Sequence, residues 1–130
     1  MKPLARIRIA WPGGALSASL EDTPTARALL AALPAQSRAL TWGEEVYFEV
    51  PIDAALEPGA RQIVEPGTVC FWTQGSALAL PYGRTPISQD ERPKLANRCN
   101  VLGKLEGDPN KLASVREGER ITVTLESVPK

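Results

Sequence analysis

Apolar and polar residues alternate in several short stretches of this chain, a pattern typical of half-buried β-strands. Ala5, Ile7 and Ile9 alternate with two arginines, and after a turn at 11–14 the apolar residues of 16–20 alternate with serines. These two stretches predict a hairpin. Comparable patterns predict further strands at 46–50, 62–64, 69–73, 77–80, 99–102 and 121–125.

One segment, at about residues 23–33, has the spacing of an α-helix instead. Asp22 or Thr23 provides a capping side chain, and Pro24 suits the first helical position, where its missing N–H costs nothing. Pro34 ends the segment. The apolar stripe at helical spacing consists of Ala26, Leu29, Leu30 and Leu33.

The order of these elements predicts the fold class. About eight short strands, one main helix and frequent Gly/Pro turns favour a mostly β, antiparallel barrel or sandwich. The length of 130 residues suits a single domain spanning 1–130. Closure into a barrel would remove exposed strand edges, which otherwise pair with other chains.

Charge and hydropathy exclude several classes of partner. Lys+Arg and Asp+Glu balance at 15 each, so no basic field predicts nucleic acid or an anionic membrane as a partner. No apolar run reaches the roughly 18 residues that a membrane-spanning helix needs. Arg6 and Arg8 interrupt the N-terminal apolar stretch, so no signal peptide is predicted. A cytoplasmic location is the expectation.

The chain contains no histidine, and this limits its chemistry. Histidine-activated nucleophiles and imidazole-based zinc sites are excluded. Cys70 and Cys99 lie in apolar runs without CxxC spacing, which predicts small core residues that remain free thiols. No phosphate-binding loop and no metal-ligand cluster is present, so we expect neither a cofactor nor a metal.

Six motifs follow one another between about residues 41 and 125. They are TWGEEVYF (41–48), VEPG (64–67), FW (71–72), YGRTPIS (82–88), NVLGK (100–104) and VREGERI (115–121). In this order they resemble a small prokaryotic family of unknown function with a cyclophilin-like fold.

The resemblance implies a closed antiparallel β-barrel with a helix packed against one open end. It does not imply prolyl isomerase activity, because fold does not carry function and the isomerase's Pro-Phe-His-Arg type segment is missing. In the family pattern prolines follow the FW motif, whereas this chain has Thr73-Gln74.

Four aromatic residues are candidates for lining a binding site. Tyr47 and Trp72 fall out of phase with the apolar residues of their strands, so they are predicted to point away from the core. A pocket for a small organic ligand or a peptide would explain them, and so would a minor cluster packed under loops. The four candidates are Trp42, Tyr47, Trp72 and Tyr82.

Glutamates accompany these aromatics. Glu45 and Glu49 share a strand face but lie about 13 Å apart, too far for a glycosidase pair, which needs roughly 5 to 9.5 Å. Glu45 is therefore a candidate to act alone, as a hydrogen-bond acceptor or a general base. The alternative is an ordinary strand charge in a salt bridge.

Three further residues are candidates for polar recognition of a ligand. Arg84 and Thr85 lie in the long polar loop 82–93, where a guanidinium could bind a carboxylate. In the alternative interpretation, Arg84 bridges surface carboxylates and Thr85 caps a turn. Asn100 interrupts an apolar strand, and its amide either fixes this long loop or contacts the ligand.

These observations predict a binding module for a small organic ligand or a peptide, contacted by the residues above. Two alternatives stay open: an enzyme, either a prolyl isomerase or a small hydrolase or isomerase with Glu45 as base, and a protein–protein docking module. An enzyme predicts a carboxyl of raised pKa in a cleft. A binding module predicts a mostly apolar pocket, and a docking module a flat apolar patch.

Overall fold

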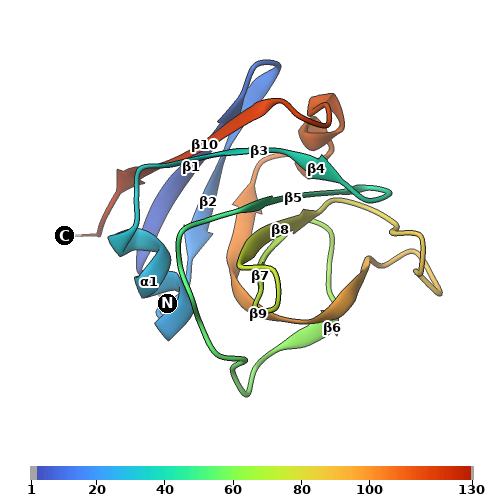
Figure 1. The fold of residues 1–130 in the computed structure, drawn as a ribbon, viewed down its shortest axis with the longest axis horizontal. Helices are drawn as coiled ribbons and strands as arrows, with labels where there is room; N and C mark the ends of the chain where they lie inside the picture. Colours follow the sequence, from blue (N-terminus) through green and yellow to red (C-terminus); the bar gives the residue numbers. More distant parts are fainter. Residues whose placement is uncertain (1–2, 130) are drawn as a thin grey trace.

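The computed structural model describes residues 3–129 and, within them, ten β-strands, one α-helix and one 3-10 helix (Figure 1). The helices are α1 (Pro24–Ala31) and η1 (Pro109–Ser114). The strands are β1 (Ala5–Trp11), β2 (Gly14–Leu20), β3 (Ala35–Arg38), β4 (Leu40–Thr41), β5 (Glu45–Glu49), β6 (Arg61–Ile63), β7 (Thr68–Trp72), β8 (Ala77–Pro81), β9 (Lys94–Glu106) and β10 (Arg120–Ser127).

Every strand predicted from alternation is present, with three differences. β3 and β4 were not predicted, because they are short and carry few apolar residues. β9 is much longer than the predicted 99–102, since its first half contains the polar pair Asn97-Arg98, which hides the strand pattern.

The strands form an antiparallel sheet in the order β3-β10-β1-β2-β9-β7-β8-β5-β4, and β6 pairs with β9. The mostly β, antiparallel fold class is thus confirmed. The closed barrel is wrong, because the hydrogen-bonded order has two ends, β3 and β4, that do not pair with each other in the described part of the chain.

The physical reason is that both ends belong to one extended segment, residues 35–41, which we call the seam segment. β3 pairs with β10, and beyond Ala39 the same segment pairs as β4 with β5. The Ala39 amide donates to the carbonyl of Glu119 at 2.8 Å, and its carbonyl accepts from Gly118 N–H at 2.7 Å. The two end strands, β3 and β4, are therefore consecutive in the chain and are joined through Ala39, not by hydrogen bonds between strands.

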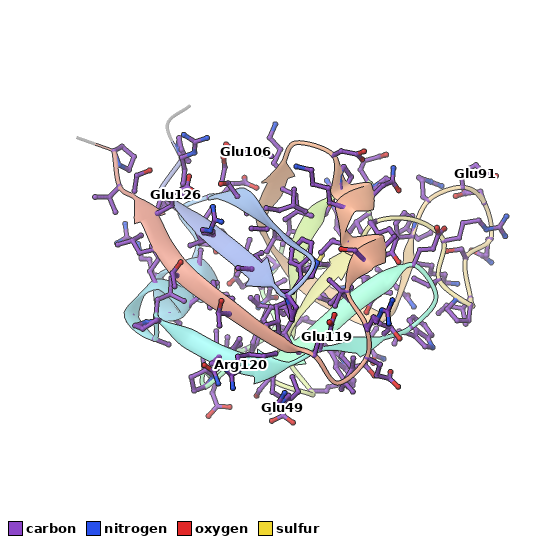
Figure 2. All side chains as sticks on the ribbon, turned by 90° about the horizontal axis from the view of Figure 1, so that it is seen from above. Glu49, Glu91, Glu106, Glu119, Arg120 and Glu126 are labelled. Atoms are coloured by element: carbon purple, nitrogen blue, oxygen red, sulfur yellow. The ribbon has the colours of Figure 1, made fainter. Side chains whose placement is uncertain are left out.

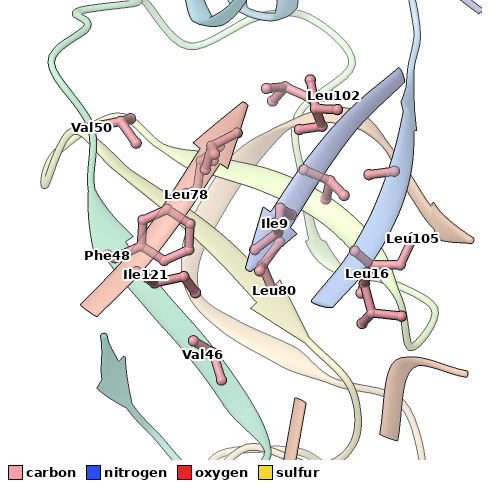
Figure 3. Packing of buried hydrophobic residues seen from close by; sticks show 14 of the residues in the cluster. Ile9, Leu16, Val46, Phe48, Val50, Leu78, Leu80, Leu102, Leu105 and Ile121 are labelled. Atoms are coloured by element: carbon pink, nitrogen blue, oxygen red, sulfur yellow. The ribbon is translucent and has the colours of Figure 1, made fainter. Parts of the chain in front are cut away.

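One face of the sheet covers the main hydrophobic core (Figure 3). On β5, Val46 and Phe48 point into this core, as the alternation predicts. Side chains from β1, β7, β8 and β10 meet them there. Fully buried members include Ile7, Ile9, Phe71, Leu78, Leu80 and Ile121.

α1 begins as predicted, with the Thr23 hydroxyl accepting from Ala26 N–H at 3.1 Å and Pro24 in the first position. Its stripe enters the core through Ala26 and Leu29, which are fully buried. The helix ends at Ala31, two residues before the predicted end.

A second, smaller cluster lies on the opposite face of β7 and β8, because alternate residues of these strands point away from the main core. Tyr47 and Trp72 pack against it. Its buried members are Val64, Cys70, Ala79, Leu95 and Cys99. Both cysteines are buried free thiols, as predicted.

β9 joins the two parts of the sheet, because it pairs with β2 near one end and with β7 and β6 along the rest. Gly103 pairs with Leu20 on one side and Val69 on the other. A Cβ at this position would lie 1.9 Å from the carbonyl oxygen of Ser19. Only glycine fits where β2 comes this close.

Charged side chains project from the outside of the sheet (Figure 2). Arg6 donates to Glu106 and lies 3.9 Å from Glu126, which forms a small exposed ion-pair group. Glu91 lies in the loop between β8 and β9. Among residues 3–129, no helix is long and apolar enough to cross a membrane.

Candidate functional site

A cavity of about 240 Å³ opens on the face of the sheet that carries the second cluster. It lies against β5, β7, β8 and β9, with the turn before β5 at its edge. Its lining is mostly apolar and aromatic. The lining residues are Trp42, Glu45, Tyr47, Trp72, Ala79, Leu95, Ala96 and Cys99.

Strand alternation explains how side chains from β5 and β7 reach the cavity. Glu45 and Tyr47 point away from the main core because Val46 and Phe48 point into it. Trp72 follows the same rule on β7, opposite in phase to Phe71. The prediction that Tyr47 and Trp72 leave the core face is confirmed.

The small side chain of Ala79 leaves space for the cavity. In register it lies between Tyr47 on β5 and Cys70 on β7. A methyl group between these two larger neighbours leaves the space above β8 unfilled. The cavity is therefore a consequence of residue size at one position of β8.

Glu45 is the buried charge-bearing group of this cavity, with 6% of its surface exposed. Its Oε1 atom is buried and has no hydrogen-bond partner among the described residues. Burial away from water disfavours the carboxylate and raises the pKa of Glu45 to about 7. The group therefore changes charge near neutral pH, and a ligand donor would satisfy its free oxygen.

Tyr47 and Trp72 form a corner of the cavity. Their ring centroids are 6.5 Å apart and the ring planes meet at 85°. The Trp72 indole N–H is shared between Gln74 Oε1 and Asn97 Oδ1, each at 3.2 Å. The side chains of Gln74 and Asn97 thus hold the indole in place.

Trp42 reaches the cavity from the turn between β4 and β5. The turn is closed by Trp42 N–H donating to the Glu45 carbonyl at 3.0 Å, and Gly43 takes a positive φ of 59°. Glu44 then fixes the turn to the loop 82–93, because its carbonyl accepts from Tyr82 N–H at 2.8 Å and its carboxylate from Arg84 N–H at 3.1 Å. The edge of the cavity thus depends on contacts outside it.

Four of the eight predicted site residues lie outside the cavity lining. Tyr82 packs against the main core. Arg84 is exposed, 4.0 Å from the carboxylate of Glu91. Thr85 is buried, and its hydroxyl donates to the Lys94 carbonyl. Its backbone N–H donates to the Ser88 hydroxyl at 2.9 Å.

Asn100 also lies away from the cavity and is fully buried. Its Oδ1 accepts from Glu57 N–H at 2.7 Å, and its Nδ2 donates to Thr25 Oγ1 and the Ala55 carbonyl, both at 2.9 Å. The amide therefore fixes the segment before β6 to the start of α1, whereas the sequence predicted that it would fix the loop 82–93 or contact a ligand.

The sequence did not identify Ala79, Leu95, Ala96 and Cys99 as lining residues. Leu95 and Ala96 lie on the part of β9 that alternation did not predict. Burial and the nearby Glu45 raise the pKa of Cys99 to about 12, and burial also raises the pKa of Cys70. Both thiols stay protonated at neutral pH and are poor nucleophiles.

Residues 3–129 contain no group of three or more Cys, Asp or Glu placed to hold a metal ion. The groups that line the cavity are one carboxyl group, one protonated thiol and a set of aromatic and apolar side chains.

Comparisons with known proteins agree with the fold. No curated protein matches the chain. The solution structure of a hypothetical protein from Archaeoglobus fulgidus is similar, with 31% sequence identity and a TM-score of 0.81, over 97% of this chain and 98% of that one. The Cyclophilin-like family matches residues 5–124. The chain therefore belongs to the Cyclophilin-like family.

Proposed function

We propose that this protein is a binding module that holds a small organic molecule in the 240 Å³ cavity. One observation carries the proposal: an apolar, aromatic hollow contains a single buried carboxyl group with an unpartnered oxygen. Ligand sites have this composition, with apolar walls for affinity and few polar groups for orientation. A buried polar atom without a partner is costly, and a ligand donor would remove that cost.

The size of the cavity favours a small molecule over a peptide. An engineered apolar cavity of about 150 Å³ holds benzene, or about 25 Å³ for each ring carbon. By this measure 240 Å³ holds about ten non-hydrogen atoms. All but the smallest dipeptides are already larger than that.

An enzyme is the second candidate, and the raised pKa of Glu45, about 7, favours it. A general base works best when its pKa is close to the working pH. Acid–base catalysis also needs a second group, and the thiol of Cys99 is held neutral. Binding therefore comes first, and a Glu45-dependent reaction second.

Docking stays a prediction with less support. Exposed large apolar side chains occur on separate elements, at Leu40 on β4, Ile87 in the loop 82–93 and Leu125 on β10.

For prolyl isomerisation, a chymotrypsin-coupled assay on an X-Pro peptide is decisive. We expect no acceleration at micromolar protein.

Tryptophan fluorescence tests the binding function, because two of the three tryptophans line the cavity. The third, Trp11, is buried in the main core, with its indole N–H donating to Ser114 Oγ at 2.8 Å. A thermal-shift screen of small organic molecules would supply ligands, since a ligand of the native state raises the Tm.

For each ligand found, we expect a fluorescence change in the wild type and in Trp11→Phe. In Trp42→Ala combined with Trp72→Ala the change should vanish, because the remaining indole is remote from the cavity. A response that persists in the double variant would place the ligand elsewhere and end the proposal.

A further inference from the structure

The charge pattern of the cavity identifies the class of ligand. Within residues 3–129, Glu45 is the only charged side chain in the lining. No lysine or arginine of the described chain lines the cavity to neutralise it. A negatively charged ligand would be repelled by the ionised Glu45 carboxylate, with no positive side chain in the lining to offset the repulsion.

The aromatic side chains of the lining also favour a positively charged ligand. The faces of aromatic rings carry negative charge density, so they attract cations, and indole does so best. Trp42, Tyr47 and Trp72 supply three such rings around the site of one carboxyl group. The perpendicular arrangement of Tyr47 and Trp72 gives two walls of different orientation.

We propose that the ligand is a small organic ammonium ion, with its charged nitrogen bound by the Glu45 carboxylate and its apolar part packed against the three aromatic rings. This inference rests on the proposed binding function. It explains the unpartnered Oε1, because an ammonium N–H donates to a carboxylate in a charge-assisted hydrogen bond.

Proton linkage gives the inference a distinctive signature. The other titratable groups around Glu45 are the thiols of Cys70 on β7 and Cys99 on β9, both of which stay neutral, and the phenol of Tyr47 on the same strand. Glu45 is thus the group that titrates near neutral pH. An ammonium ion binds only the ionised carboxylate, so affinity should rise with pH up to about 7 and then level off.

The test compares two probes of the same size. Phenethylammonium and 2-phenylethanol each have about nine non-hydrogen atoms, which matches the capacity estimated from cavity volume. Calorimetry at pH 8 measures both. We expect the ammonium ion to bind at least about tenfold more tightly, the difference expected when a buried carboxylate gains a charged partner.

Two variants complete the test. Glu45→Gln should abolish the preference for the ammonium probe and its pH dependence, because the amide carries no charge. Glu49→Gln is the matched control, since this exposed glutamate lies on the same strand but outside the cavity, and it should behave as the wild type. Below pH 7, ammonium affinity for the wild type should fall about tenfold per pH unit.

The outcomes separate the two proposals. If neither probe binds at millimolar concentration, the binding function fails for ligands of this size. If both bind equally, or if Glu45→Gln keeps the preference, the binding function stands and the ammonium inference is wrong. If Glu45→Gln does not fold, the pH profile of the wild type decides, and a flat profile overturns the inference.

Discussion

At the scale of single residues, Glu45 and Glu49 show how strand position sets the chemistry of a side chain. Both belong to β5 and to the same face. Glu49 lies at the exposed end of the strand, whereas Glu45 is buried beside the cavity. Only Glu45 loses its contact with water, and its pKa rises to about 7 as a result.

This burial predicts a pH-dependent stability. Between the ordinary pKa of 4.5 and about 7, the folded state keeps a proton that the unfolded state has lost. The free energy of unfolding should therefore fall as pH rises through this window, by up to about 3 kcal/mol. Glu45→Gln should remove this fall. Urea unfolding at pH 5 and pH 8 measures it, and Glu49→Gln should retain the wild-type slope.

Asn100 carries a structural role that can be measured separately. Asn100→Ala leaves the Thr25 hydroxyl, the Ala55 carbonyl and the Glu57 amide without their partner. We expect a loss of about 2–3 kcal/mol in the free energy of unfolding. Urea denaturation provides the value, and the exposed Asn110→Ala serves as control, with a change within about 0.5 kcal/mol. Equal effects of both variants would contradict this role.

At the scale of elements, the β4–β5 turn shows how a loop determines the edge of a site. Gly43 packs so closely against the loop 82–93 that a Cβ would lie 2.8 Å from Pro86 Cδ and 3.0 Å from the Arg84 carbonyl oxygen. Glu44 adds its hydrogen bonds to the same loop. Trp42 is therefore held at the cavity by contacts between its turn and the loop 82–93.

The contrast between two glycines tests this coupling. Gly43→Ala combines a positive φ with steric overlap, so it should cost about 2 kcal/mol or more and weaken ligand binding by displacing Trp42. Gly59 has no atom within 4 Å of the Cβ position, and Gly59→Ala should leave the Tm unchanged or slightly higher. Thermal melting of both variants decides, and similar Tm values would refute the coupling.

At the scale of the whole molecule, β9 connects the two faces of the structure. It belongs to the main core through Leu102 and Leu105 and to the cavity cluster through Leu95 and Cys99. At Gly103 and Lys104, β9 pairs with both β2 and β7, and Gly103 is the one with a backbone too close for a Cβ. A substitution of Gly103 should therefore disturb the packing of the main core and of the cavity cluster together.

Gly103→Ala therefore has a larger predicted effect than a typical substitution. The added methyl group overlaps the Ser19 carbonyl and separates β2 from β9. We expect a loss of at least about 4 kcal/mol, close to the total stability of many domains. Soluble yield and circular dichroism report the loss. The exposed neighbour Lys104→Ala should fold normally, and a well-folded Gly103→Ala protein would show that the strands can move apart.

The sequence predicted the parts of this molecule that depend on local periodicity. The strand faces of β5 and β7 follow from alternation, and so does the outward position of Tyr47 and Trp72. Ala79 and Leu95 could not be predicted as lining, because their role depends on neighbours in other strands. The barrel prediction failed because pairing between distant strands is not encoded in any single stretch of residues.

The seam segment links these scales. Residues 35–38 pair with β10, residues 40–41 pair with β5, and Trp42 follows at once. If this segment separated from its neighbours, the hydrogen bonds to β10 and to β5 would break, and Trp42 would leave the cavity at the same time. Ligand binding in the cavity should consequently slow deuterium uptake at amides as far away as Gln36. Backbone amides of β3 would then report on ligand binding beside the Trp42 indole.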